Sequence, residues 1–151
     1  MALDIAKLSA DKLRTLIKNA DAKGEKELSA KAFKQLCAIQ PAAAVDDGLP
    51  ADDPIRIAFW RAVHAAEEIR TQANGRTTRL ARTREKAKRD GIIATMEAMA
   101  LKSQPSEGFS ILVDGGHPEF VFEHIIATHP ERFSKPAIEA ARLRLAKHEL
   151  S

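Results

Sequence analysis

The sequence is poor in cysteine and in aromatic residues. Among 151 residues it has one cysteine, one tryptophan, six phenylalanines and no tyrosine. A single cysteine excludes a disulfide within the chain and a metal centre built from several thiolates. Because Cys37 lies in the apolar pattern LSAKAFKQLCAI, we interpret it as a small buried side chain rather than as a catalytic thiol.

Long hydrophobic runs are also absent. No apolar stretch approaches the roughly 20 residues that a membrane-spanning helix needs. The first residues, MALDIAKLSADKLR, have neither the basic start nor the apolar stretch of a secretory signal. We therefore expect a cytoplasmic protein without a membrane partner. A bacterial source would be consistent with this expectation.

The sequence lacks the common motifs of nucleotide-binding and hydrolytic enzymes, since GxxxxGK[ST], GxGxxG and GxSxG do not occur. We predict no catalytic residues, no metal site and no cofactor. A metal-dependent enzyme is an alternative hypothesis, with His117, Glu119, Glu123 and His124 as its candidate ligands. His117 and His124 are two helical turns apart, or about 10 Å, which is too far for both to bind one zinc ion directly. Elemental analysis for bound metal would test this alternative.

The residues that are abundant favour helices. The chain is rich in alanine, and together with Leu, Lys, Arg and Glu this residue favours helix. Apolar residues recur at helical spacing over residues 9–40, with a break at Gly24. The following PAAAVDDGLPADDP has three prolines and four aspartates and no periodicity. We predict an all-α fold with an N-terminal helical hairpin at 1–40, a linker at 41–53 and a C-terminal helical domain at 54–151.

The C-terminal domain is predicted to begin with a helix over 54–73. Asp53 followed by Pro54 is a favourable helix start, because proline at the first helical position gives up an amide that would have no partner. An apolar stripe at helical spacing predicts the core face of this helix, formed by Ile55, Phe59, Val63, Ala66 and Ile69. Trp60 lies at the edge of the stripe as a core anchor, whereas we expect His64 at an exposed or edge position.

The remaining segments predict a bundle of short helices. Asn74-Gly75 is expected to end the preceding helix, and a new helix is predicted over 78–90. Gly91 separates that helix from another over 92–102. Helix, glycine turn and short helix are the outline of a helix-turn-helix. We predict a short helix rather than a strand at FSILV, a helix opened by Pro118, and a last helix opened by Ser134 whose apolar residues include Leu143.

Positive charge is concentrated in NGRTTRLARTREKAKR, residues 74–89. This stretch has seven basic residues and one acid, a net charge of +6, whereas the whole chain is only +3. A local basic run points to a polyanionic partner more strongly than a high isoelectric point does. On a continuous helix from residue 76, five cations share an arc of about 140°. They are Arg76, Arg79, Arg82, Lys86 and Arg89, whereas Arg84 and Lys88 are expected on the far side of the helix.

The residues between these cations favour nucleic acid over other partners. The stretch has no broad apolar face for a bilayer surface and no row of apolar anchors for a partner groove. It also has no aromatic residue for base stacking, so we favour duplex DNA over RNA. The predicted binding residues are the five cations, with Thr77 and Thr78 as neutral phosphate donors at the helix start.

Two alternatives to nucleic-acid binding stay open. The charge run can be a solvated face, with several arginines neutralised by acids such as Glu67, Glu68 and Asp90. The chain can also be an adaptor, whose N-terminal hairpin docks on a protein partner while the basic helix meets an acidic protein surface. Nucleic acid that co-purifies with the protein and leaves at high salt would separate DNA binding from the adaptor hypothesis.

Overall fold

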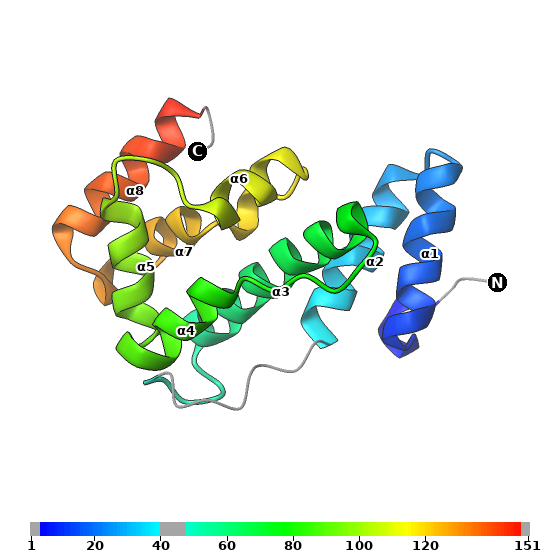
Figure 1. The fold of residues 1–151 in the computed structure, drawn as a ribbon, viewed down its shortest axis with the longest axis horizontal. Coiled ribbons are helices and arrows are strands. Elements are labelled where there is room, and N and C mark those ends of the chain that lie inside the picture. Colours follow the sequence, from blue (N-terminus) through cyan, green and yellow to red (C-terminus); the bar gives the residue numbers. More distant parts are fainter. Residues whose placement is uncertain (1–3, 40–47, 149–151) are drawn as a thin grey trace. The chain divides into compact units, whose positions relative to one another are not determined.

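The computed structural model describes residues 4–39 and 48–148, in which helices are joined by turns and loops (Figure 1). Eight α-helices and three short 3-10 helices account for their regular structure, and no strand occurs within these two ranges. The prediction of an all-α protein is confirmed. Most of the predicted linker, residues 41–47, lies outside the described residues.

The chain divides into two compact units, Met1–Pro41 and Ala42–Ser151. The first contains the 3-10 helix η1 (Ile5–Lys7) and the helices α1 (Ala10–Ala22) and α2 (Lys26–Ile39). Ser9 caps α1, since its hydroxyl accepts a hydrogen bond from the Lys12 amide at 3.3 Å. The two helices pack through a small core of Leu13, Ala32 and Leu36.

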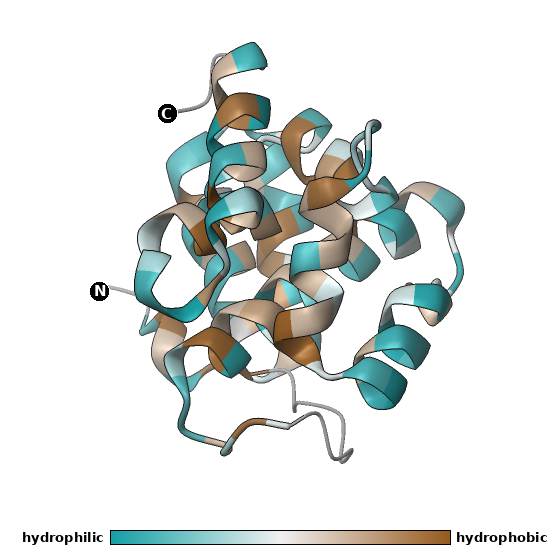
Figure 2. Cartoon of the chain, turned by 90° about the vertical axis from the view of Figure 1, so that its left-hand side faces the viewer, coloured by the Kyte–Doolittle hydropathy of each residue, from teal (hydrophilic) through white to brown (hydrophobic). Residues whose placement is uncertain are grey.

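The second unit contains the other helices. These are α3 (Pro54–Asn74), α4 (Ala81–Asp90), α5 (Ile92–Leu101), α6 (Glu107–Asp114), η2 (Pro118–Phe120), α7 (Phe122–Thr128), η3 (Pro130–Arg132) and α8 (Lys135–Lys147). Helix α3 packs against α6 and α7, α8 packs against α5 and α7, and α4 packs against α5. Many helices carry hydrophobic and hydrophilic residues on opposite sides (Figure 2), which is the pattern expected when each buries one face.

Helix α3 begins as its sequence predicts but is buried on more sides than its apolar stripe indicated. The Asp53 carboxylate accepts a hydrogen bond from the Ile55 amide at 2.9 Å, and Pro54 occupies the first turn. Trp60 is buried as expected. The prediction that His64 is exposed or at an edge was wrong, since only 7% of the residue is accessible and its ring lies 5.9 Å from that of Trp60. Buried alanines beside the stripe let neighbouring segments cover this side of the helix.

Three further segments compare with their predictions in different ways. FSILV is helical in α6, and the Ser106 hydroxyl caps this helix by accepting from the Phe109 amide at 3.2 Å. Pro118 begins only a 3-10 turn, and the α-helix after it starts at Phe122. In α8 the apolar residue Leu143 is 73% exposed, whereas the adjacent Arg144 is buried.

Candidate nucleic-acid interface

The basic stretch folds as a loop followed by a helix rather than as one helix. Gly75 ends α3 with a positive φ of 72°, a conformation that glycine adopts without steric cost. The chain then runs without helical structure to Leu80, and α4 begins at Ala81. The expectation that Arg76 and Arg79 share a helical arc with the later cations was therefore wrong. The predicted helix start at Thr77 or Thr78 was also too early.

Glu67 explains why α4 begins where it does. This residue of α3 is 5% exposed, and its carboxylate accepts a hydrogen bond from the Leu80 amide at 2.8 Å. Leu80 is the residue that precedes α4, and its own side chain cannot cap the helix. A carboxylate at a helix N-terminus also interacts favourably with the helix dipole. The start of α4 therefore depends on an acid that lies 13 residues earlier in the chain.

The same carboxylate binds the first turn of α4 through Arg84. The Arg84 guanidinium donates from Nε to Glu67 Oε2 and from Nη2 to Oε1, both at 2.6 Å, in a bidentate pair. Hydrogen bonding to Glu67 raises the pKa of Arg84. The guanidinium also lies 5.4 Å from the centre of the Trp60 ring. Arg84 is thus a structural cation, in agreement with its expected place away from the binding face.

Threonines and an asparagine hold the loop before α4. The Thr78 amide donates to the Thr71 hydroxyl at 3.0 Å, and Asn74 Nδ2 donates to the Thr78 hydroxyl at 2.9 Å. The Thr78 hydroxyl itself donates to the Arg76 carbonyl at 3.1 Å. The hydroxyl of Thr78, which was predicted to bind phosphate, is therefore already engaged within the loop, whereas Thr77 is exposed.

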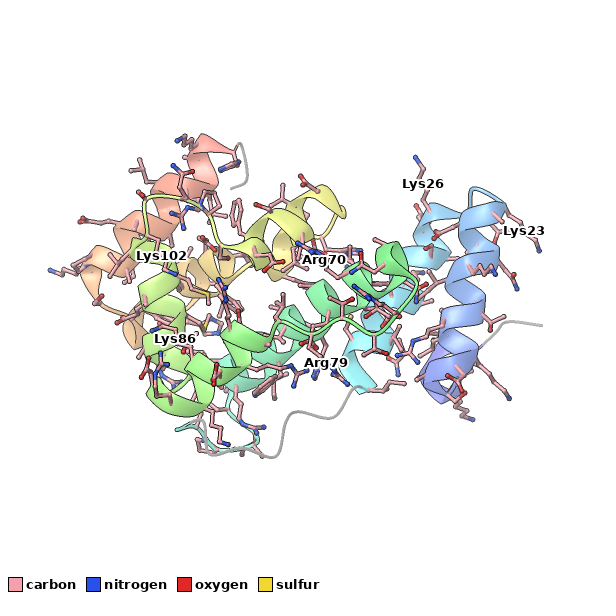
Figure 3. The ribbon with its side chains drawn as sticks, in the orientation of Figure 1. Lys23, Lys26, Arg70, Arg79, Lys86 and Lys102 are labelled. Carbon is pink, nitrogen blue, oxygen red and sulfur yellow. The ribbon has the colours of Figure 1, made fainter. Side chains whose placement is uncertain are left out.

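Six side chains of the basic stretch remain open to solvent to different degrees. We call them the accessible cations; they are Arg76, Arg79, Arg82, Lys86, Lys88 and Arg89. Lys86 is the least open of them, with 27% of its side chain exposed. Lys88, which the helical wheel placed on the far side, is exposed as well. Figure 3 shows Arg79 on the loop before α4 and Lys86 on α4 itself.

Asp90 neutralises part of this charge at the end of α4. Lys86 Nζ lies 2.9 Å from Asp90 Oδ2, and Arg89 Nε lies 3.2 Å from Asp90 Oδ1. The hydrogen bonds from Arg89 and Lys86 lower the pKa of Asp90, so this carboxylate is charged at neutral pH. Because these groups are accessible to water, the pairs are weak and phosphate can compete for the cations.

The accessible cations therefore differ in how much charge they can offer to a ligand. Arg79 lies 3.6 Å from Glu67 with 61% of its side chain exposed. Arg76, Arg82 and Lys88 form no ion pair with any residue in the described ranges. Seven cations of residues 76–90 stand against Glu85, Asp90 and the buried Glu67, which leaves a net charge of +4. The local excess is smaller than the sequence indicated but still positive.

The alternative metal site does not assemble from its predicted ligands. Glu123 is 2% exposed and forms a buried ion pair with Arg144, at 2.8 Å between Oε2 and Nη1. Glu119 lies 3.7 Å from His117. Across residues 4–39 and 48–148, no three His, Cys, Asp or Glu side chains are arranged to hold a metal ion. One of the two candidate carboxylates, Glu123, is already bound to an arginine.

In the described part of the chain, no helix combines the length and the apolar character needed to cross a bilayer. Comparisons with protein-family models, with curated proteins and with solved structures find no significant match to this chain.

Proposed function

We propose that this chain is a nucleic-acid-binding protein that contacts duplex DNA in preference to RNA through the accessible cations. The observation that carries the proposal is the set of cations on α4 and its preceding loop, several of which have no acidic partner among the described residues. Phosphate backbones require cations with reach rather than a fixed apolar surface. Of the apolar residues in this segment, Leu80 and Ala87 are buried and Ala81 is exposed, and one alanine methyl group is too small to anchor a bilayer or a groove.

The arrangement of α4 and α5 supports duplex DNA as the partner. Gly91 alone separates the two short helices, with a φ of 92°, and in this proposal the pair acts as a helix-turn-helix-like element. No aromatic residue lies within residues 74–91, which disfavours binding by base stacking. In this proposal Arg76, Arg79, Arg82, Lys86 and Arg89 contact phosphates or the groove, and Lys88 joins them as a further exposed cation. Thr77 can add a neutral hydrogen bond.

Binding to a fluorescent duplex of random sequence, measured by anisotropy across a salt titration, tests the proposal. If about five cations contact phosphates, the logarithm of the binding constant should fall against the logarithm of salt with a slope of about −4 to −5. Single strands and duplex RNA serve as competitors and should displace the duplex less well. An absence of binding at low salt would contradict the proposal and favour the adaptor hypothesis, in which the basic segment meets an acidic protein.

The double variant Arg76→Glu/Arg82→Glu tests the assigned residues. Neither arginine has an ion pair within the described residues, so the fold should survive the change. We expect binding to fall by at least about 100-fold at 0.1 M salt, since two phosphate contacts are lost and replaced by repulsion. The control is Lys23→Glu/Lys26→Glu, which makes the same change of charge at exposed positions of the first unit. Equal losses in both variants would show that only net charge matters.

A further inference from the structure

The proposed interface contains a buried acid, and the negative charge of this acid should oppose the binding of a polyanion. Glu67 carries a negative charge within hydrogen-bond distance of Arg84 and 3.6 Å from Arg79, one of the accessible cations. By long-range electrostatics alone, this charge lowers the positive potential that attracts a polyanion. Nevertheless it is among the most buried charged groups of the molecule, and three neighbouring groups of the basic stretch point at its two oxygens.

Few other contacts fix the position of helix α4. It has ten residues, a length at which an isolated helix is marginal in water. Its only buried residue is Ala87, and Leu80 adds one apolar side chain just before its start. The bidentate pair with Arg84 and the bond from the Leu80 amide therefore provide much of the link between α4 and α3. Without that link, the side chains of Arg79 and Arg82 lose a fixed backbone from which to reach phosphates.

We propose that Glu67 is a positioning residue for polyanion binding, whose buried carboxylate fixes the loop of residues 76–80 and the start of α4 so that Arg79 and Arg82 are presented together. This inference rests on the proposed function. It predicts that removing a negative charge from the interface weakens the binding of a polyanion. Simple electrostatics predicts the opposite sign, which makes the two explanations separable.

Two variants that each remove one carboxylate charge give the matched test. Glu67→Gln breaks the bidentate pair, whereas Asp90→Asn frees Lys86 and Arg89 from an exposed acid. At 0.1 M salt, one phosphate contact contributes about eightfold to binding, with a slope of about −0.9. We expect Glu67→Gln to bind the random duplex about eightfold or more weakly, with the magnitude of its salt slope reduced by about 1. We expect Asp90→Asn to bind about two- to fivefold more tightly, because the acid no longer competes for two cations.

A second variant, which changes no charge, provides a test if Glu67→Gln does not fold. Thr71→Val removes the hydroxyl that accepts from the Thr78 amide and leaves Glu67 and Arg84 untouched. If the ordered loop is what binding requires, this variant also weakens binding while its thermal unfolding stays cooperative. Hydrogen exchange in the absence of nucleic acid gives an independent measure: the Leu80 amide should be protected in the wild type and exchange at least tenfold faster in Glu67→Gln.

The outcomes separate this inference from the function on which it rests. Wild-type protein that fails to bind the duplex contradicts the proposed function, and this inference with it. Wild-type protein that binds, with a folded Glu67→Gln variant that binds as tightly or more tightly, overturns the role of Glu67 alone. If Glu67→Gln does not fold, Thr71→Val decides, and unchanged binding by that variant overturns the inference.

Discussion

The side chain of Arg144 joins three elements of the second unit. From α8 it donates to the Met99 carbonyl at 3.1 Å, to the Lys102 carbonyl, and to Glu123 of α7 at 2.8 Å. Met99 and Lys102 lie at the C-terminal end of α5, where carbonyl groups lack partners within the helix. One guanidinium thus satisfies a buried carboxylate and two carbonyls.

At the residue scale we expect Arg144→Met to destabilise the protein more than Glu123→Gln. The arginine variant leaves a buried carboxylate and two carbonyl groups without their donor, at a cost of about 3–5 kcal/mol. The glutamine variant leaves the arginine its two carbonyl partners and should cost less, roughly 2–3 kcal/mol. Urea unfolding followed by circular dichroism measures both. A loss below about 1 kcal/mol in Arg144→Met would show that this buried network contributes little.

Helix starts in this protein are fixed by side chains from the neighbouring sequence and from other elements. Asp53 caps α3 and also pairs with Arg132 of η3, with 2.9 Å between Oδ2 and Nη2. Ser134, which caps α8, donates its own amide to Glu97 of α5 at 2.6 Å. Glu67 supplies the cap for α4. Carboxylates therefore connect the starts of three helices to distant segments.

At the element scale, Asp53→Ala and Asp53→Asn should separate the two roles of this residue. Asparagine keeps an acceptor for the Ile55 amide but loses the charge, whereas alanine loses both. We expect a loss of about 1–2 kcal/mol for alanine and clearly less for asparagine in thermal or urea unfolding at pH 7. Equal losses would mean that the helix cap contributes nothing beyond the pair with Arg132.

The difference between wild type and Asp53→Asn should also depend on pH. Hydrogen bonding to Arg132 lowers the pKa of Asp53 below its usual 3.8. A carboxyl group with a lowered pKa in the folded state stabilises the protein above the pKa of the unfolded state. We therefore expect the advantage of the wild type to be present at pH 5–7 and to shrink as the pH falls below about 4.

The stability of the whole second unit should respond to the burial of His64. Burial lowers the pKa of this imidazole, and Arg84 and Arg79 lower it further, against the opposing effect of Glu67. The unfolded chain takes up a proton below a pH of about 6.5, whereas folded His64 does so only at lower pH. Because the unfolded state then binds more protons, the free energy of unfolding decreases as the pH falls from about 6.5.

At the scale of the molecule, unfolding measured between pH 7.5 and 5 should therefore differ between wild type and His64→Gln. The wild type should lose up to about 1.4 kcal/mol per pH unit more than the variant below pH 6.5. The other histidines are common to both proteins, so the difference isolates His64. Parallel pH profiles would contradict the assignment of this histidine as a buried neutral group.

How much of this structure the sequence could predict depends on how local each signal is. The start of α3 at Asp53-Pro54 and the caps of α1, α6 and α8 by Ser9, Ser106 and Ser134 depend on residues within one turn. They were predictable for that reason. His64 was placed wrongly because periodicity assumes one buried face for each helix, and neighbouring helices decide which faces are covered.

The candidate interface also combines features that depend on neighbouring residues with features that depend on the tertiary structure. The sequence by itself determined that the chain is helical and that its positive charge is concentrated near residues 76–89, because helix propensity and charge are properties of neighbouring residues. Only the tertiary structure decided where α4 begins and which cations stay accessible. Glu67 illustrates this, since it lies 13 residues from Leu80 and 17 from Arg84 in the chain and contacts both only in the folded protein.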